Sequence, residues 1–199
     1  MKHKYFFFAL FATVAMSFGC SREYNLEQTI FIYDPEFQDL PIYSEWGYNS
    51  FGAYYDREAF ISLYDGVPLK IVVTGDSTTF IFSGHKGSFS DEQMKMKFVF
   101  FNYNPSDYLD LLELDNTTYD LTQENIMVIV SFKDVDYVAS VFEGSIQFKR
   151  AQNLYVDEHQ VEVILSGLFN FKALVNDEPV SVTDGRFDCG IDNTNFFNY

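Results

Sequence analysis

Apolar side chains at every second position are the feature of this chain that most constrains its fold. The stretch from Met94 to Phe98 alternates methionine or phenylalanine with lysine, and two later stretches repeat the pattern. Successive side chains of a β-strand point to opposite faces, so this period gathers the apolar members on one face. The residues expected to point inward are Met94, Met96 and Phe98, then Ile146 and Phe148, then Phe169, Phe171 and Ala173.

Glycine, asparagine, aspartate and proline separate many such short runs, which is the spacing of antiparallel strands and turns. Residues 69–74 and 78–83 are expected to form a hairpin across residues 75–77. Continuous apolar runs at 98–101 and 126–130 favour strands that are covered on both faces, as in stacked sheets. The sequence therefore predicts an all-β protein, an antiparallel β-sandwich or a flattened barrel.

One short helix is compatible with the sequence, over residues 105–112. Pro105 and Ser106 are suited to its first turn, and the helical period supplies an apolar stripe. That stripe consists of Tyr108, Leu111 and Leu112.

The first 19 residues have the layout of a secretory signal peptide. Lys2 and Lys4 precede a 12-residue apolar run that ends shortly before Cys20. The run is shorter than the ~20 residues of a membrane-spanning helix. Gly19-Cys20 resembles the lipobox of bacterial lipoproteins, which implies cleavage before Cys20 and acylation of that residue. An ordinary signal peptide, with Cys20 left as a spare thiol, is the alternative.

This layout divides the chain into three parts and implies a place for it. Residues 1–19 are expected to be the signal peptide, 20–28 the lipidated cysteine and a polar tether, and 29–199 a single β domain. The protein is then expected at the cell envelope, attached through lipid on Cys20 and with the outer membrane as the favoured site. Several acyl chains on one residue hold a protein firmly, whereas a single chain binds only marginally.

The charge of the chain excludes one class of partner. It carries 29 acidic and 13 basic residues, for a net charge of −16. Nucleic-acid affinity depends on basic contacts to phosphate, so neither DNA nor RNA is an expected partner.

Three blocks resemble a group of outer-membrane lipoproteins common in bacteroidete bacteria. The first covers residues 40–47 and 51–54, the second 165–173 with its Ser-Gly-x-Phe-x-Phe motif, and the third 182–188 with Thr-Asp-Gly-Arg-Phe-Asp. The resemblance implies an all-β, envelope-attached protein without assigned catalytic residues. From the residues themselves we expect a bulge or close backbone approach at Gly167, a tight turn at 184–185, and a carboxylate partner for Arg186.

Catalytic patterns are not found in the sequence. After the signal, the histidines are His85 and His159, without metal-ligand spacing, and there is no Gly-x-Ser-x-Gly motif. Cys189 is expected to be a buried apolar residue. No catalytic residue, cofactor or metal site is therefore predicted. Two possibilities stay open, calcium binding by the acidic group Asp184, Asp188 and Asp192, and glycosylation of Ser77.

An aromatic cluster is the strongest candidate for ligand binding. It comprises Tyr43, Trp46, Tyr48 and Tyr54, interleaved with polar residues. Such rings can stack against a glycan or peptide, or they can fasten the N-terminal segment to the domain. The sequence thus favours a non-enzymatic, glycan- or peptide-binding lipoprotein. A hydrolase acting on polysaccharides and a subunit of a pilus-type surface assembly are the alternatives.

Overall fold

The strands of the protein join into one sheet that curls around and closes on itself. The computed structural model describes residues 29–62, 66–87, 93–156 and 159–199. The expected signal peptide, Cys20 and the tether lie outside these residues. The strands are β1 (Ser50–Tyr55), β2 (Glu58–Ile61), β3 (Leu69–Thr74), β4 (Ser77–Lys86), β5 (Gln93–Phe101), β6 (Thr117–Asp120), β7 (Ile126–Phe132), β8 (Val135–Val156), β9 (His159–Val175), β10 (Glu178–Ile191) and β11 (Phe196–Asn198).

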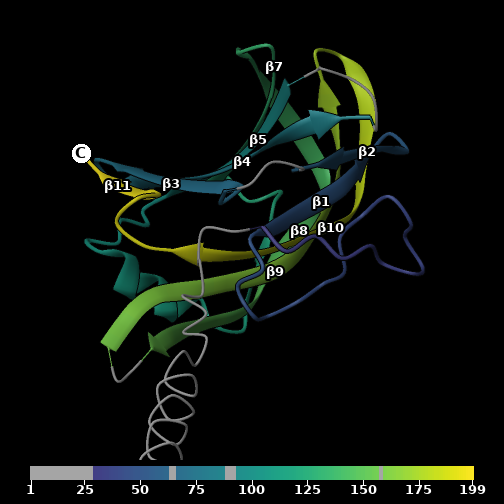
Figure 1. The fold of residues 1–199 in the computed structure, drawn as a ribbon. Helices are drawn as coiled ribbons and strands as arrows, with labels where there is room; N and C mark the ends of the chain where they lie inside the picture. The colour runs from purple at the N-terminus through teal and green to yellow at the C-terminus, as the bar shows by residue number, and fades with distance from the viewer. Residues whose placement is uncertain (1–28, 63–65, 88–92, 157–158) are drawn as a thin grey trace, which may run out of the picture.

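Eight of these strands form a closed antiparallel barrel in the order β4-β2-β1-β10-β9-β8-β7-β5, with β5 pairing back to β4 (Figure 1). β3 and β11 continue outward from β4, and β6 pairs with the middle of β8, at residues 145–148. The prediction of an all-β fold is confirmed, and of its two forms the barrel is the one observed.

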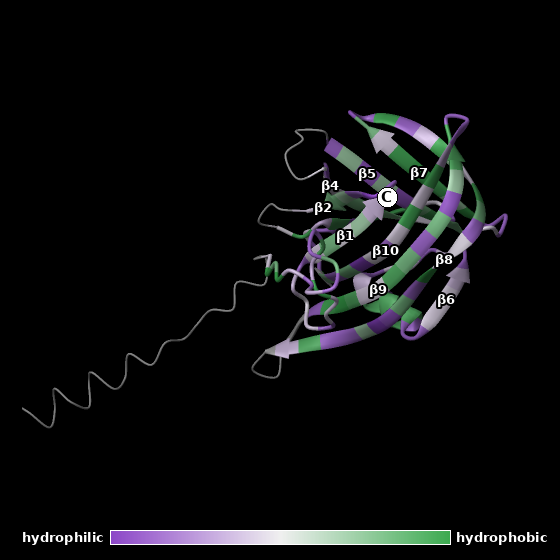
Figure 2. Ribbon diagram, turned by 90° about the vertical axis from the view of Figure 1, so that its right-hand side faces the viewer, coloured by the Kyte–Doolittle hydropathy of each residue, from purple (hydrophilic) through white to green (hydrophobic). Residues whose placement is uncertain are grey.

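The predicted alternation is confirmed along the barrel. Met94, Met96 and Phe98 point inward and are buried. The residues expected to point inward in β8 and β9 are buried too, namely Ile146, Phe148, Phe169, Phe171 and Ala173. Figure 2 shows the resulting exchange of polar and apolar residues along β8 and β9. The predicted hairpin is also present, with β3 paired to β4 from Leu69–Phe82 to Thr74–Ser77.

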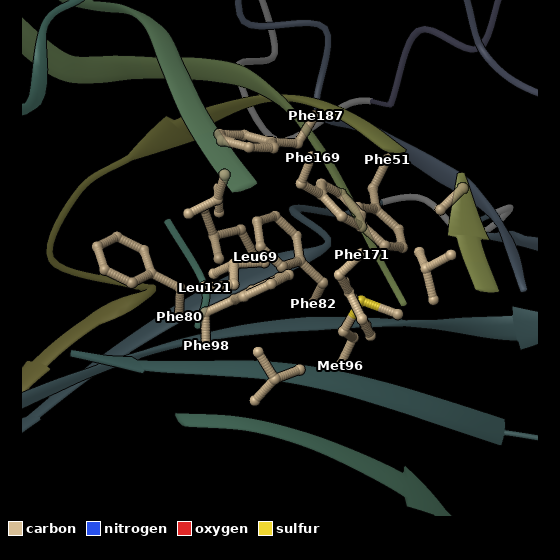
Figure 3. Packing of buried hydrophobic residues seen from close by; sticks show 14 of the residues in the cluster. Phe51, Leu69, Phe80, Phe82, Met96, Phe98, Leu121, Phe169, Phe171 and Phe187 are labelled. Atoms are coloured by element: carbon tan, nitrogen blue, oxygen red, sulfur yellow. The ribbon is translucent and has the colours of Figure 1, made fainter. Parts of the chain in front are cut away.

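Phenylalanine rings fill the interior of the barrel. Phe51 stacks on Phe82 with ring centroids 4.8 Å apart, and Phe98 meets Phe169 edge to face at 5.3 Å (Figure 3). An eight-stranded barrel is just wide enough for side chains to fill it. The interior in the described part is therefore packed core, and ligand binding has to be sought on the outer surface.

The runs at 98–101 and 126–130 are strands, but the expectation that both their faces are covered was wrong. Val128 and Val130 are buried whereas Met127 and Ile129 are half-buried. The reason is that a single curled sheet has one inner face, while stacked sheets would cover both faces of a strand.

The predicted helix is a 3₁₀-helix, η1 (Tyr108–Leu114). Asp107 caps it by accepting a hydrogen bond from the Leu109 N–H, and Asp110 completes a capping box. The start expected at Pro105 and Ser106 was therefore two to three residues early. Leu111 is buried, and Tyr108 and Leu112 pack against the core as expected.

Candidate functional site

Residues 29–49, here called the strap, cross the outside of the barrel and contact β1, β2 and β10 before β1 begins. Within the strap, Tyr33 bridges to Pro41, and the Ile42 N–H donates to the Ile32 carbonyl at 2.7 Å. The strap lies so close to β1 that a Cβ at Gly52 would be only 2.5 Å from the ring of Pro41. Glycine at this position is what lets the strap lie directly on the sheet.

An ion pair fastens the middle of the strap. Arg186 Nη1 lies 2.6 Å from Asp34 Oδ2, and the guanidinium also lies over the ring of Phe37. Burial raises the pKa of Asp34, but the N–H groups of Glu36 and Phe37 and the Arg186 charge outweigh burial, so the pKa is lowered overall. The carboxylate partner expected for Arg186 is thus confirmed as Asp34.

Asp188 holds the end of the strap. Its carboxylate accepts hydrogen bonds from the backbone N–H groups of Trp46, Gly47 and Tyr48 at 3.2, 2.9 and 3.0 Å. Asp188 is 1% exposed. A buried carboxylate with three donors fixes the conformation of this loop, residues 44–48.

The structure places the four aromatic candidates in different environments. Trp46 projects into solvent with 72% of its surface exposed, whereas Tyr43 donates a hydrogen bond to Glu45 at 2.9 Å. Burial and Glu45 raise the pKa of Tyr43. Tyr48 is half-buried, and Tyr54 packs on Phe37 at 6.4 Å. Among the described residues, no ring contact joins two of these four.

The Asp184-Gly185 pair is not the tight turn that was expected. It lies inside β10, where the pairing with β9 shifts between Val182 and Gly185. Asp184 adopts the left-handed backbone conformation, with φ of 55°. Gly185 is needed for space, because a Cβ there would lie 2.5 Å from the Phe169 ring. The feature is therefore a β-bulge.

Glu162 is a buried acid beneath the strap. It is 4% exposed and lies next to Gly190, where a Cβ would collide with its carboxyl group. Burial, with smaller contributions from the charges of Asp192 and Asp188, raises its pKa to about 7. The Asp188 charge acts on Glu162, but both carboxyl groups are shielded from solvent, and Asp188 already accepts three hydrogen bonds from the 44–48 loop.

The raised pKa of Glu162 gives a pH-dependent stability. Between its ordinary pKa of 4.5 and about 7, the folded chain keeps a proton that the unfolded chain releases. The free energy of unfolding therefore falls as the pH rises through this window. We expect Glu162→Gln to remove this dependence and to stabilise the protein at pH 8 by about 3 kcal/mol relative to its effect at pH 4. Urea unfolding at both pH values measures this, with Glu178→Gln at an exposed position as the control. An equal effect of Glu162→Gln at the two pH values would contradict it.

A groove of about 800 Å³ opens on the outer face of β1 and β10. Tyr54 lines it together with the turn that joins β1 to β2. In that turn Asp56 accepts a hydrogen bond from the Ser181 N–H at 2.9 Å, and Arg57 has φ of 74°. The lining residues are Tyr54, Asp56, Arg57, Ser181 and Thr183.

A second hollow of about 270 Å³ shares Ser181 and Thr183 with the first and extends across β9 to β8. Lys172 and Glu143 form an ion pair there at 2.9 Å, and Asp184 and Asn170 contribute polar groups. We call the two hollows together the outer groove. Bulges in β1, β8 and β10 adjoin it and bend the sheet locally.

Of the aromatic candidates, Tyr54 lines the outer groove, whereas Trp46 belongs to a different part of the surface. Along β10 the order is Ser181 and Thr183 in the groove, then Arg186 under the strap, then Asp188 under the 44–48 loop. Sequence reasoning missed the other groove residues. The sequence did contain one indication of them, because Asn170 and Lys172 alternate with inward-facing phenylalanines and therefore had to point outward.

The cysteine and the two histidines of the described residues do not form a shared site. Cys189 is buried, with its thiol 3.9 Å from the Ser50 carbonyl, and burial raises the pKa of that thiol. Within the described ranges, no three His, Cys, Asp or Glu residues are grouped as a metal site. His159 belongs to β9, far along the chain from His85 in β4.

No helix among the described residues is both long and apolar enough to cross a membrane. Comparison of the chain with protein-family models, with curated proteins and with solved structures found no match.

Proposed function

We propose that this protein is a non-enzymatic lipoprotein of the cell envelope that binds a neutral oligosaccharide in the outer groove. The lipobox-like sequence at Cys20 supports the location. The observation that carries the binding proposal is the composition of the groove, in which one aromatic wall adjoins hydroxyl, guanidinium and carboxylate groups. The packed barrel interior leaves the outer face as the place for a ligand.

The groove supplies the groups that a sugar needs. Tyr54 offers a ring face, Arg57 offers donors, and the carboxylates of Asp56 and Asp184 offer acceptors for sugar hydroxyl groups. Positive and negative side chains are both present, so a ligand without net charge is favoured over an anion.

A peptide fits this surface less well. Extended peptides commonly bind by adding a strand to an open sheet edge. β1, β10, β9 and β8, which carry the groove, are each paired with neighbours on both sides. The groove is thus a sheet face without an edge to extend, and side-chain contacts to a glycan are the better match.

Arg57→Gly tests the proposal without damaging the fold. Glycine accepts the positive φ of Arg57, so the turn is retained while the guanidinium is lost. We expect at least a tenfold weaker affinity for the glycan that the wild-type protein selects on a glycan array, measured by titration calorimetry. Asp177→Gly is the matched control, because Asp177 has φ of 64° in the corresponding turn between β9 and β10.

Three outcomes would change the assignment. Unchanged affinity of the Arg57→Gly variant would exclude the groove. Loss of binding in Trp46→Ala alone would move the site to the 44–48 loop. Selection of peptides, with no glycan bound, would replace the ligand class.

A polysaccharide hydrolase is the second candidate, favoured by the raised pKa of Glu162 beside Asp188. In this case Glu162→Gln would abolish hydrolysis of a polysaccharide panel by the wild-type protein. We rank it below binding because glycoside hydrolysis needs two carboxyl groups that reach the substrate, and these are 4% and 1% exposed.

A further inference from the structure

The strap exposes four large apolar side chains to solvent. Trp46 is 72% exposed and Tyr33 is 61% exposed, and Ile32 and Ile42 complete the group. The hydrogen bond from the Ile42 N–H to the Ile32 carbonyl and the bridge between Tyr33 and Pro41 keep Ile32, Tyr33 and Ile42 together. We call these four residues the apolar face of the strap.

The apolar face lies where the chain enters the domain. The Ile30 N–H donates to the Tyr48 carbonyl at 2.8 Å, so the first residues of the strap run beside the loop that carries Trp46. The Thr29 hydroxyl donates to the Gly66 carbonyl at 2.8 Å and fixes the same point to the barrel. Cys20 precedes Thr29 by nine residues. Nine residues span at most about 32 Å when fully extended, so lipid on Cys20 would keep this face close to the membrane.

The loop with Trp46 is built to keep its shape. Three backbone N–H groups are bound by the buried Asp188, and the Gln152 side chain donates to the Glu45 carbonyl at 2.8 Å. The tryptophan is thus held outward by a fixed backbone, and its burial against a partner costs little backbone entropy.

We propose that the apolar face of the strap rests on the bilayer that holds the lipid of Cys20, with Trp46 inserted at the headgroup level. Tryptophan and tyrosine favour this level because their rings are apolar and their tips are polar. The strap also carries the acidic Glu36, Asp39 and Glu45. These charges disfavour anionic headgroups, so the partner is a zwitterionic lipid surface.

This orientation rests on the lipid anchoring in the proposed function but not on glycan binding. It also leaves the outer groove accessible, because the groove occupies the other half of β10, beyond the Arg186–Asp34 ion pair. One surface would then face the membrane while another takes the ligand.

Trp46 is the single tryptophan of the chain and reports its own position. Lipidated mature protein is bound to vesicles of phosphatidylcholine and phosphatidylethanolamine, with and without brominated acyl chains. We expect bromine to quench the Trp46 emission by more than half. The control is a double variant, Trp46→Phe with Tyr199→Trp, whose only tryptophan is at the 77% exposed C-terminus, which follows β11 beside β3 (Figure 1). Its emission is expected to be unquenched.

Each other outcome overturns the proposal. If the protein floats with the vesicles but the Trp46 emission is not quenched, the lipid anchor is supported and the proposed orientation is wrong. Equal quenching at both positions means that the domain has no preferred face. Protein that does not float, with Cys20 unmodified by mass spectrometry, removes the anchor itself.

Discussion

Asp188→Ala is expected to lower the free energy of unfolding by about 4 kcal/mol and to release the 44–48 loop from the barrel. The substitution leaves the N–H groups of Gly47 and Tyr48 without their acceptor, and it leaves the Trp46 N–H with the Ser44 hydroxyl alone. Hydrogen bonds to a charged group contribute about 1.5–3 kcal/mol each, and their losses are only partly additive. Urea unfolding followed by circular dichroism measures the stability. The anisotropy of Trp46 fluorescence measures the release, and it should fall.

Asp120→Ala is the control for this change. Asp120 also accepts a backbone hydrogen bond, from the Thr122 N–H at 2.9 Å, but it is exposed at the end of β6. We expect its loss to change the free energy of unfolding far less, because an exposed carboxylate and its N–H partner both stay hydrated. Asp188→Asn keeps one acceptor oxygen and should lie between the two. Equal effects of Asp188→Ala and Asp120→Ala would refute the view that Asp188 fixes the 44–48 loop.

Gly167→Ala is expected to destabilise the barrel by about 3–5 kcal/mol, with a smaller yield of folded protein. A Cβ at this position would overlap the Gln147 carbonyl on β8 and would lie 2.6 Å from the ring of Phe187. The carbonyl belongs to the β8–β9 pairing and cannot move without breaking it. Thermal unfolding measures the effect, as a lower melting temperature.

A glycine in open space provides the comparison. Gly75 lies in the β3–β4 turn with φ of 61° and no atom within 4 Å of a Cβ. Asparagine tolerates this backbone conformation, so Gly75→Asn should change the stability by less than about 1 kcal/mol. If Gly167→Ala were as mild as Gly75→Asn, the close approach of β8 and β9 at this point would be wrong.

Local sequence patterns predicted the strands because the alternation of polar and apolar residues in each strand reflects its solvent-facing and core-facing sides. The period of two at Met94, Met96 and Phe98 follows directly from having one wet and one dry face. Gly167 could be assigned a close approach because a strand interior seldom tolerates glycine otherwise. Closure into a barrel was not predictable in this way. It depends on β1 pairing with β10 and β4 pairing with β5, and no short stretch encodes both partners.

The candidate site was predicted only in part, for the same reason. Tyr54 was identified from its aromatic neighbours in sequence, but its companions Ser181 and Thr183 come from a distant strand. The burial of Glu162 and the three bonds to Asp188 arise from the strap, which covers residues that lie far along the chain. In the sequence, the acids around 184–192 are indistinguishable from acids of an exposed turn. The bulge at Asp184 also looked like an Asp-Gly turn, and only the pairing of β10 with β9 separates the two.

The pairing of β1 with β10 has a consequence for how the protein is made. Phe51 aligns with Phe187, so the first barrel strand meets its partner only when nearly the whole chain is available. Contacts between such distant residues form slowly, because a long loop must close before they are made. A nascent chain that ends before Glu178 lacks β10 and cannot complete the ring. If the chain is exported unfolded, as the proposed lipoprotein function requires, this delay would keep it competent for translocation until β10 has emerged on the far side.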